Sequence, residues 1–269
     1  MERILETAQW LKDRGIDNAE VGIVLGSGLG DLAHRIKEEK SFSYNVIPNF
    51  AIATVEFHFG KLIYGELGGK KVIALQGRYH YYEGYSMEQI VLPVRVMKLL
   101  GVKCILLSNA AGAVNLDFKK GSLMLVDDHI NLQPENPLRG RNLDDLGPRF
   151  PDMSRPYDAR INDLMREIAR EKGITLHEGI YASVQGPNLE TRAEYRMMQI
   201  IGADAVGMST VPEVIACNHM GTPCACVSVL TDECDPDNLA AVSVEEIIAI
   251  AQQTEKHLSE LYIELISRL

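Results

Sequence analysis

Short apolar runs that alternate with helical patterns constrain the fold of this chain more than any other feature of its sequence. Six runs have the length and composition of strands, and small or polar residues follow each of them: 21–25, 72–75, 104–107, 123–126, 205–208 and 226–230. Apolar residues recur at helical spacing over residues 1–6, 86–100, 157–172, 191–201, 211–220 and 244–269. Strands interleaved with helices predict an α/β sandwich.

Turn signals refine this fold. The glycine-rich stretch 64–70 predicts a hairpin, which makes the sheet mixed rather than purely parallel. A chain of 269 residues can form one large domain or two small ones. We expect a single domain over residues 1–269, built as a three-layer sandwich with a mixed sheet between helices. The proline-rich stretch 133–156 lacks periodicity, and loops of this length tend to be functional or mobile.

Composition excludes several classes of function. The net charge of −10 disfavours nucleic acid and anionic lipid as partners. No apolar window reaches the roughly 18 residues that a membrane span requires, and the first residues carry mixed charge without the features of a signal peptide. We therefore expect a cytoplasmic protein that binds small molecules. The five cysteines, four of them in apolar runs, predict buried free thiols and no structural metal site.

Residues 26–30 read Gly-Ser-Gly-Leu-Gly, directly after the first predicted strand and before a helix. Glycines in such a turn let backbone N–H groups approach a bound anion, and the Ser27 hydroxyl adds a donor. A dinucleotide motif does not fit, because Asp31 stands where that motif has its third glycine. The turn therefore indicates phosphate binding, with a purely structural strand-to-helix turn as the alternative.

Residues 76–85 read Gln-Gly-Arg-Tyr-His-Tyr-Tyr-Glu-Gly-Tyr and follow another predicted strand. Arg78 offers a planar, permanently charged fork for phosphate oxygens, and His80 adds a donor. The four tyrosines can cover a sugar while their hydroxyls bond it. This segment favours an anionic, sugar-like ligand, with an exposed loop of ordinary surface aromatics as the alternative.

Three further clusters place polar groups at the ends of strands or the starts of helices, at residues 108–112, 186–191 and 207–213. Thr191 with Glu194, and Thr210 with Glu213, have the spacing of capping boxes, which predicts that these four residues start helices. Ser86 with Gln89 has the same spacing at the start of the helix predicted to end at Leu100. Other residues of these clusters, such as Glu190 and Ser209, stand just outside the caps, where they can face a ligand.

Taken together, these motifs resemble those of the trimeric purine nucleoside phosphorylases. The resemblance rests on residues 26–30, 76–85, 109–112 and 207–213, in this order and spacing, and spans nearly the whole chain. It implies a mixed, partly barrel-like sheet flanked by helices. It also implies attack of phosphate on C1′ of a purine nucleoside, giving free base and ribose 1-phosphate, without a cofactor or a metal. The expected assembly is a homotrimer.

The resemblance also implies roles for individual residues. Phosphate is held by Ser27, Arg78, His80, Ser209 and the backbone amide of Ala110. The ribose is contacted by Tyr82 and Met208, by Val244 where many members have a histidine, and by Phe150 of the neighbouring subunit. The purine is bound by Glu190, Asp232 and Leu189, and His58 belongs to a mobile region near the phosphate. Glu190, Asp232 and His80 are the expected catalytic residues.

Departures from the family pattern affect the choice of purine. Members that act on inosine and guanosine usually carry asparagine where this chain has Asp232, and an ionised aspartate can only accept hydrogen bonds. Asp232 would therefore repel O6 yet welcome the amine of adenine. The purine pocket also resembles that of the methylthioadenosine phosphorylases, at residues 231–235 and at Val244. Glu190 argues the other way, because its carboxylate suits the N1 proton of a 6-oxopurine.

Two nearby carboxylates can also share one proton, which would turn one of them into a donor. We expect a phosphorylase of 6-oxopurine nucleosides. An adenosine or methylthioadenosine phosphorylase is the alternative of the same fold. The third hypothesis, from a different class, is a nucleoside-binding protein without turnover.

Overall fold

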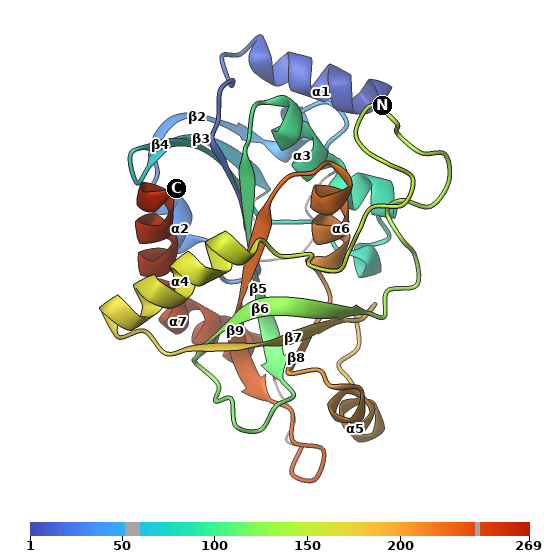
Figure 1. Cartoon of the computed structure of the whole chain (residues 1–269), viewed down its shortest axis with the longest axis vertical. Helices are drawn as coiled ribbons and strands as arrows, with labels where there is room; N and C mark the ends of the chain where they lie inside the picture. Colours follow the sequence, from blue (N-terminus) through green and yellow to red (C-terminus); the bar gives the residue numbers. More distant parts are fainter. Residues whose placement is uncertain (52–59, 240–242) are drawn as a thin grey trace.

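One nine-stranded sheet runs through the computed structural model, which describes residues 1–51, 60–239 and 243–269 (Figure 1). The strands are β1 (Val21–Leu25), β2 (Lys37–Ser43), β3 (Lys61–Leu67), β4 (Lys70–Gln76), β5 (Cys104–Ala113), β6 (Leu123–Asn131), β7 (Leu176–Ser183), β8 (Ala205–Gly207) and β9 (Cys224–Glu233). Their order across the sheet is β2-β3-β4-β1-β5-β8-β7-β6-β9.

The sheet is mixed, and half of it closes on itself. Strands β4, β1 and β5 run parallel, whereas β2, β3 and β4 form an antiparallel meander whose β3–β4 turn is the predicted hairpin. Strand β5 pairs with β8 on one side and with β9 on the other, so β5, β8, β7, β6 and β9 form a closed barrel. The predicted mixed, partly barrel-like sheet is confirmed.

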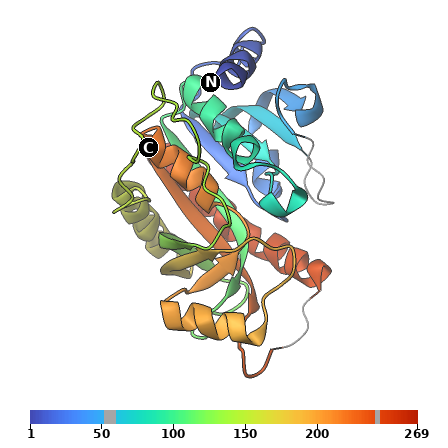
Figure 2. The same ribbon diagram turned by 90° about the vertical axis from the view of Figure 1, so that its right-hand side faces the viewer.

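Seven α-helices of the described chain cover the sheet: α1 (Glu2–Lys12), α2 (Asp31–His34), α3 (Met87–Leu99), α4 (Ala159–Lys172), α5 (Arg192–Ile201), α6 (Val211–His219) and α7 (Val244–Arg268). Helices α1, α3 and α6 bury their apolar residues in one core cluster, and α2, α4 and α7 in a second. Figure 2 shows helices on both sides of the strands. This arrangement is the predicted three-layer sandwich.

The sequence suggested that the polar cluster at residues 108–112 follows a strand. In the structure this cluster lies inside β5 (Cys104–Ala113). The strand continues because β9 pairs with it residue by residue as far as Ala111 and then with a register shift. Apart from β3, which only the hairpin signal marked, two strands carried no predicted apolar run. In β2 most residues are exposed charges, a composition that protects a sheet edge, and in β7 only the second half is buried.

Two of the three predicted capping boxes are present in the structure, at the starts of α3 and α5. Ser86 and Thr191 each accept a hydrogen bond from the backbone N–H three residues later, at 3.3 Å in both cases. At Thr210 and Glu213 the predicted helix start is confirmed, because α6 begins at Val211, but the predicted capping box is absent. Thr210 has a φ of 69° and makes no side-chain cap, and Glu213 turns inward to pair with an arginine. The Glu213 carboxylate therefore pairs with the buried Arg78 and not with the backbone N–H groups at the start of α6.

The five cysteines are free and buried, as predicted. Within the described chain, no helix combines the length and the apolar composition needed to cross a membrane.

Candidate functional site

The predicted phosphate ligands meet where several strands end. Strands β1, β4 and β5 are parallel neighbours, so the turn after β1, the segment after β4 and the middle of β5 lie at one edge of the sheet. In open α/β sheets ligands bind at this carboxyl edge. The chain after β8 enters the same region, because Ser209 and Arg78 are hydrogen-bonded.

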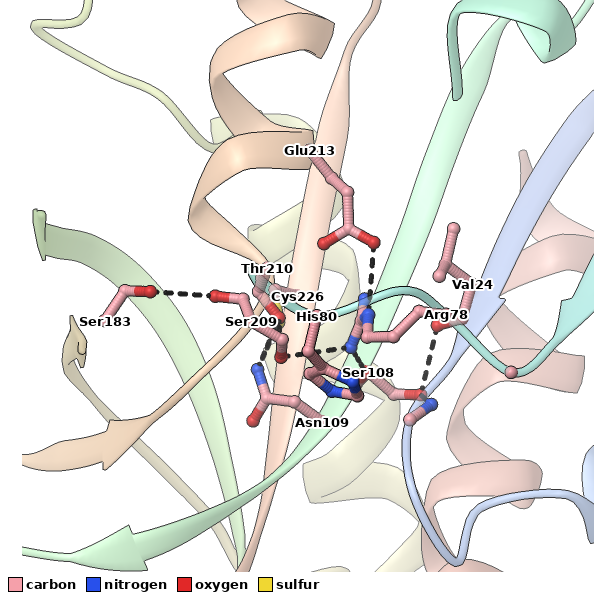
Figure 3. Close-up of polar contacts among 12 residues, drawn as sticks. Val24, Arg78, His80, Ser108, Asn109, Ser183, Ser209, Thr210, Glu213 and Cys226 are labelled. Atoms are coloured by element: carbon pink, nitrogen blue, oxygen red, sulfur yellow. Dashed lines mark hydrogen bonds and ion pairs between the residues drawn. The ribbon is translucent and has the colours of Figure 1, made fainter. Parts of the chain in front are cut away.

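Arg78 is the centre of this cluster and is only 3% exposed. Its Nε donates to Glu213 Oε1 at 3.1 Å, and its Nη1 donates to the Ser108 carbonyl at 2.5 Å and to Ser209 Oγ at 3.4 Å. Figure 3 shows Glu213, Ser108 and Ser209 arranged around the guanidinium. The ion pair with Glu213 fixes the guanidinium plane, so its donors are oriented before any ligand arrives.

Ser209 stands between β8 and α6 in a strained connection. The next residue, Thr210, has a φ of 69°, which is rare for a β-branched side chain. Its Oγ1 accepts from Asn109 Nδ2 at 2.9 Å and lies 3.1 Å from Ser209 Oγ, while Ser183 Oγ donates to the Ser209 carbonyl at 3.1 Å (Figure 3). The Thr210 and Ser183 hydroxyls thus hold Ser209 in place, and the Asn109 amide in turn fixes Thr210.

His80 is oriented by a neighbouring carboxylate. Its Nδ1 lies 2.9 Å from Glu83 Oε1, and the same oxygen accepts from the His80 backbone N–H at 2.8 Å. The imidazole also stacks on Tyr82, with ring centroids 4.8 Å apart. These contacts fix the ring plane and, in the neutral ring, make Nδ1 the donor. Tyr82, the predicted ribose contact, therefore lies beside a predicted phosphate ligand.

The glycine turn touches β5 directly. A Cβ atom on Gly26 would lie 2.7 Å from the Asn109 Cα atom and 2.8 Å from the Ser108 carbonyl oxygen. Gly28 has a φ of 73°, and Leu29 N–H donates to the Gly26 carbonyl at 3.1 Å. Only glycine at position 26 allows this approach, which brings the turn bearing Ser27 next to the β5 strand that carries Ala110.

A second group of side chains gathers near the end of β9. Asp232 Oδ1 accepts from Thr231 Oγ1 at 2.9 Å, and Oδ2 accepts from Cys234 Sγ at 3.3 Å. Burial raises the pKa of the Glu190 carboxyl, and the charge of nearby Asp232 raises it further, while hydrogen bonds from its own backbone amide and from Tyr195 oppose the rise. The two carboxyl groups are thus close enough to interact, as the sequence suggested.

The remaining predicted site residues differ in their surroundings. Met208 is half-buried, and its sulfur atom lies where a Cβ on Gly186 would stand. Leu189, Val244 and Phe150 are exposed, with Phe150 at 87%. Their contacts with a ligand or a second subunit stay predictions. His58 lies outside the described residues.

Sequence reasoning assigned no role in the site to three side chains that build it: Glu213, Glu83 and Asn109. Glu83 and Asn109 stood inside the motifs, but nothing showed which neighbour each would bond. Glu213 was read as a helix-capping residue. A signal was nevertheless present, since a buried arginine requires a carboxylate partner and Glu213 lies close in sequence to Ser209, another predicted phosphate ligand.

Comparisons with known proteins extend this picture. The chain matches the Phosphorylase superfamily over residues 20–267. It is 44% identical over 254 residues to purine nucleoside phosphorylase 1 of Bacillus subtilis, covering 94% of each chain. It is 43% identical over 266 residues to purine nucleoside phosphorylase of Mus musculus, covering 95% of this chain and 92% of the mouse protein.

Solved structures agree with these relatives. Purine nucleoside phosphorylase of Schistosoma mansoni in complex with adenosine has a TM-score of 0.94 and 39% identity, covering 100% of this chain and 98% of that chain. A schistosoma purine nucleoside phosphorylase in complex with hypoxanthine gives the same four values.

Proposed function

The chain belongs to the phosphorylase superfamily, and on this premise we propose how its residues act as a purine nucleoside phosphorylase. Such an enzyme is a pentosyltransferase. It cleaves the N-glycosidic bond of a purine nucleoside with phosphate and releases the free base and the pentose 1-phosphate. Phosphate is the co-substrate, and we propose no further cofactor.

The observation that carries the phosphate assignment is the buried Arg78, held by Glu213 with Nη1 directed to Ser209. A preoriented guanidinium, two serine hydroxyls and the His80 ring suit a dianion that must be aligned below C1′. In this proposal Ser27, Arg78, His80, Ser209 and the Ala110 amide bind phosphate. Positive charge develops on the sugar in the transition state, and the adjacent dianion stabilises it.

The purine end of the site is proposed to be the pair Glu190 and Asp232, with Leu189 beside them. An ionised Glu190 accepts the N1 proton of a 6-oxopurine, which supports inosine and guanosine as substrates. This hydrogen bond orients the base in the ground state, whereas the negative charge that grows on the departing base needs a donor. Burial raises the pKa of Glu190, so this carboxyl gains a proton more readily than an exposed one and can then serve as that donor.

One observation favours the second candidate, a 6-aminopurine. Both oxygens of Asp232 accept hydrogen bonds, from Thr231 and Cys234, so Asp232 acts as an acceptor in this structure. An ionised Asp232 accepts from the exocyclic amine of adenine but repels O6. Adenine N1 would then need a protonated Glu190, which the raised pKa makes easier.

The test is the initial rate of base release from inosine, guanosine, adenosine and methylthioadenosine, with and without phosphate. Release that continues without phosphate would contradict the phosphorylase assignment. A higher rate with adenosine or methylthioadenosine would overturn the 6-oxopurine proposal. Asp232→Asn supplies an amide donor for O6, so the ratio of inosine to adenosine kcat/KM should rise about 10-fold, the effect of one hydrogen bond of about 1.4 kcal/mol. An unchanged ratio would show that Asp232 does not read the purine 6-position.

We further propose that Tyr82, Met208 and Val244 contact the ribose, and that Phe150 reaches the site of a neighbouring subunit in a homotrimer. The 87% exposure of Phe150, a large aromatic side chain, supports an intersubunit role. Light scattering measures the assembly directly, and a monomer with full activity would contradict this part of the proposal. The cytoplasmic location stays a prediction.

A further inference from the structure

A cavity of about 580 Å³, partly open to solvent, lies away from the site described above, between α1, α3, the segment 137–143 and the end of α6. None of the residues proposed to bind phosphate or purine lines it. Its volume falls in the range of small-molecule pockets. Several separate segments of the same chain build its walls, so one chain suffices to form it.

Arg95 of α3 lines this cavity and is 4% exposed. No hydrogen bond or ion pair joins its side chain to any described residue, and Nη1 is fully buried without a partner. Burial lowers the pKa of the guanidinium, opposed by the charge of Glu88, which lines the cavity without forming an ion pair. A buried guanidinium without an acceptor is unfavourable, because protein interiors pair almost every buried charge.

His219, at the end of α6, is the second buried polar group of the cavity and is 1% exposed. Asn142 Nδ2 donates to Asp144 Oδ1 at 2.7 Å and to the Gly147 carbonyl at 2.9 Å, so its Oδ1 accepts from His219 Nε2 at 3.1 Å. Nδ1 is then the acceptor of a neutral ring, and it too is buried without a partner among the described residues. Burial and the Arg95 charge lower the pKa of His219, which favours the neutral ring, while a hydrogen bond to the Gly147 backbone opposes this shift.

The rest of the lining shows what else the cavity can accommodate. Charged residues at its wall comprise four arginines and two glutamates: Arg3, Arg95, Arg139, Arg141, Glu2 and Glu88. Apolar side chains supply another part of the wall, among them Phe50, Leu92 and Leu138. An excess of cations beside an aromatic and aliphatic surface matches a ligand with one anionic group and an apolar body.

We propose that this cavity is a second binding site, for a small organic anion with a carboxylate or phosphate group on a flat apolar body. The anion accepts hydrogen bonds from Arg95, and its apolar part packs on Phe50 and Leu92. Where the anionic group carries a hydroxyl, as in a singly protonated phosphate ester, that hydroxyl donates to His219 Nδ1. The site is independent of the proposed activity, so it can exist whether or not the enzyme prefers 6-oxopurines.

Isothermal calorimetry with 4-bromobenzoate and with phenyl phosphate tests the proposal, with 4-bromobenzyl alcohol as the neutral control. The matched variants are Arg95→Met, which keeps the length of the side chain without its charge, and Arg35→Met, which removes an exposed arginine directly after α2 on the other face of the sheet. Arg95→Met should weaken 4-bromobenzoate binding about 10- to 100-fold, the effect of charge-assisted hydrogen bonds, and Arg35→Met should leave it unchanged.

Phenyl phosphate distinguishes the two anion types. It should bind twice per wild-type chain, once near Arg78 and once near Arg95, and once per Arg95→Met chain. The alternative outcome is that phenyl phosphate binds the wild-type chain only once, at a site that Arg95→Met leaves intact. If 4-bromobenzoate still binds the cavity, the cavity then accepts carboxylates only. If 4-bromobenzoate does not bind the cavity either, the proposal is overturned.

A crystal soaked in 4-bromobenzoate locates the ligand directly through the anomalous signal of bromine, even if a variant fails to fold. Bromine density beside Phe50 with the carboxylate at Arg95 supports the proposal. Density elsewhere overturns it, and so does equal affinity for the neutral alcohol. Occupation of the cavity by a side chain of a second subunit would also overturn it, because Arg95 would then already have its anion.

Discussion

Replacing Glu213 should have two effects that the geometry separates, one on stability and one on phosphate binding. The Arg78–Glu213 pair is 3.1 Å apart, with side chains only 2% and 4% exposed. Removing one partner of a buried pair leaves an uncompensated charge and costs about 3–5 kcal/mol. With an m-value of about 3 kcal/mol/M in urea, Glu213→Ala should lower the midpoint of urea unfolding by about 1–1.7 M.

The chain offers a matched control at the same distance. Lys61 and Glu38 are also 3.1 Å apart, but their side chains are 37% and 44% exposed. Because exposed pairs contribute about 0–1 kcal/mol, Glu38→Ala should shift the urea midpoint by less than about 0.3 M. Both variants must be measured in phosphate-free buffer, since a bound anion would stabilise the folded state by mass action.

The double variant Arg78→Met/Glu213→Leu completes the thermodynamic cycle. Apolar residues of similar size can replace a buried pair at little cost, so this variant should unfold close to the wild-type midpoint although it lacks Arg78, the proposed phosphate-binding residue. Glu213→Gln keeps an acceptor but loses the charge, and it should raise the KM for phosphate about 10-fold, as expected from a loss of about 1.4 kcal/mol of orientation and hydrogen bonding. Equal midpoint shifts for Glu213→Ala and Glu38→Ala, or strict additivity in the cycle, would refute the reasoning.

Two further predictions concern the surroundings of the glycine turn. Burial raises the pKa of Glu255 to about 7, although it accepts from the Leu32 backbone N–H at 3.1 Å. Because the folded pKa lies above the unfolded one, ionising Glu255 destabilises the fold progressively from about pH 5 to above pH 7. Glu255→Gln should therefore gain up to about 3 kcal/mol over wild type at pH 8 and nothing at pH 4.5, and a pH-independent difference in Tm would contradict this. Gly26→Ala should cost about 1–3 kcal/mol by overpacking against Asn109 and should weaken phosphate binding; wild-type Tm and phosphate KM in this variant would show that the close approach is unimportant.

The sequence predicted those parts of the fold that depend on local patterns. Apolar runs marked β1, β4 and β5 because these strands are buried on both faces, and reciprocal caps marked the starts of α3 and α5. Strand β2 was not predicted, because the exposed charges that protect this edge of the sheet give it the composition of a loop. Signals of burial are local, whereas the need to protect an edge arises only once the sheet exists.

The site shows the same limit more sharply. The residue types of Arg78, His80 and Ser209 already suggested an anion, but their partners lie far away in the sequence. Glu213 is separated from Arg78 by 135 residues, and Asn109 from Thr210 by 101. No spacing rule covers such pairs. The Thr210–Glu213 spacing satisfied a local rule, and the long-range ion pair overrode it.

Thr210 suggests why that override is useful. A β-branched residue at a φ of 69° is unfavourable by about 1–3 kcal/mol, and it persists only where its surroundings determine it fully. Here Asn109 from β5 donates to its hydroxyl, and α6 starts at the next residue with Glu213 in its first turn. The strained turn therefore aims both the serine hydroxyl and the carboxylate at one guanidinium, so that folding alone preorganises the proposed anion site.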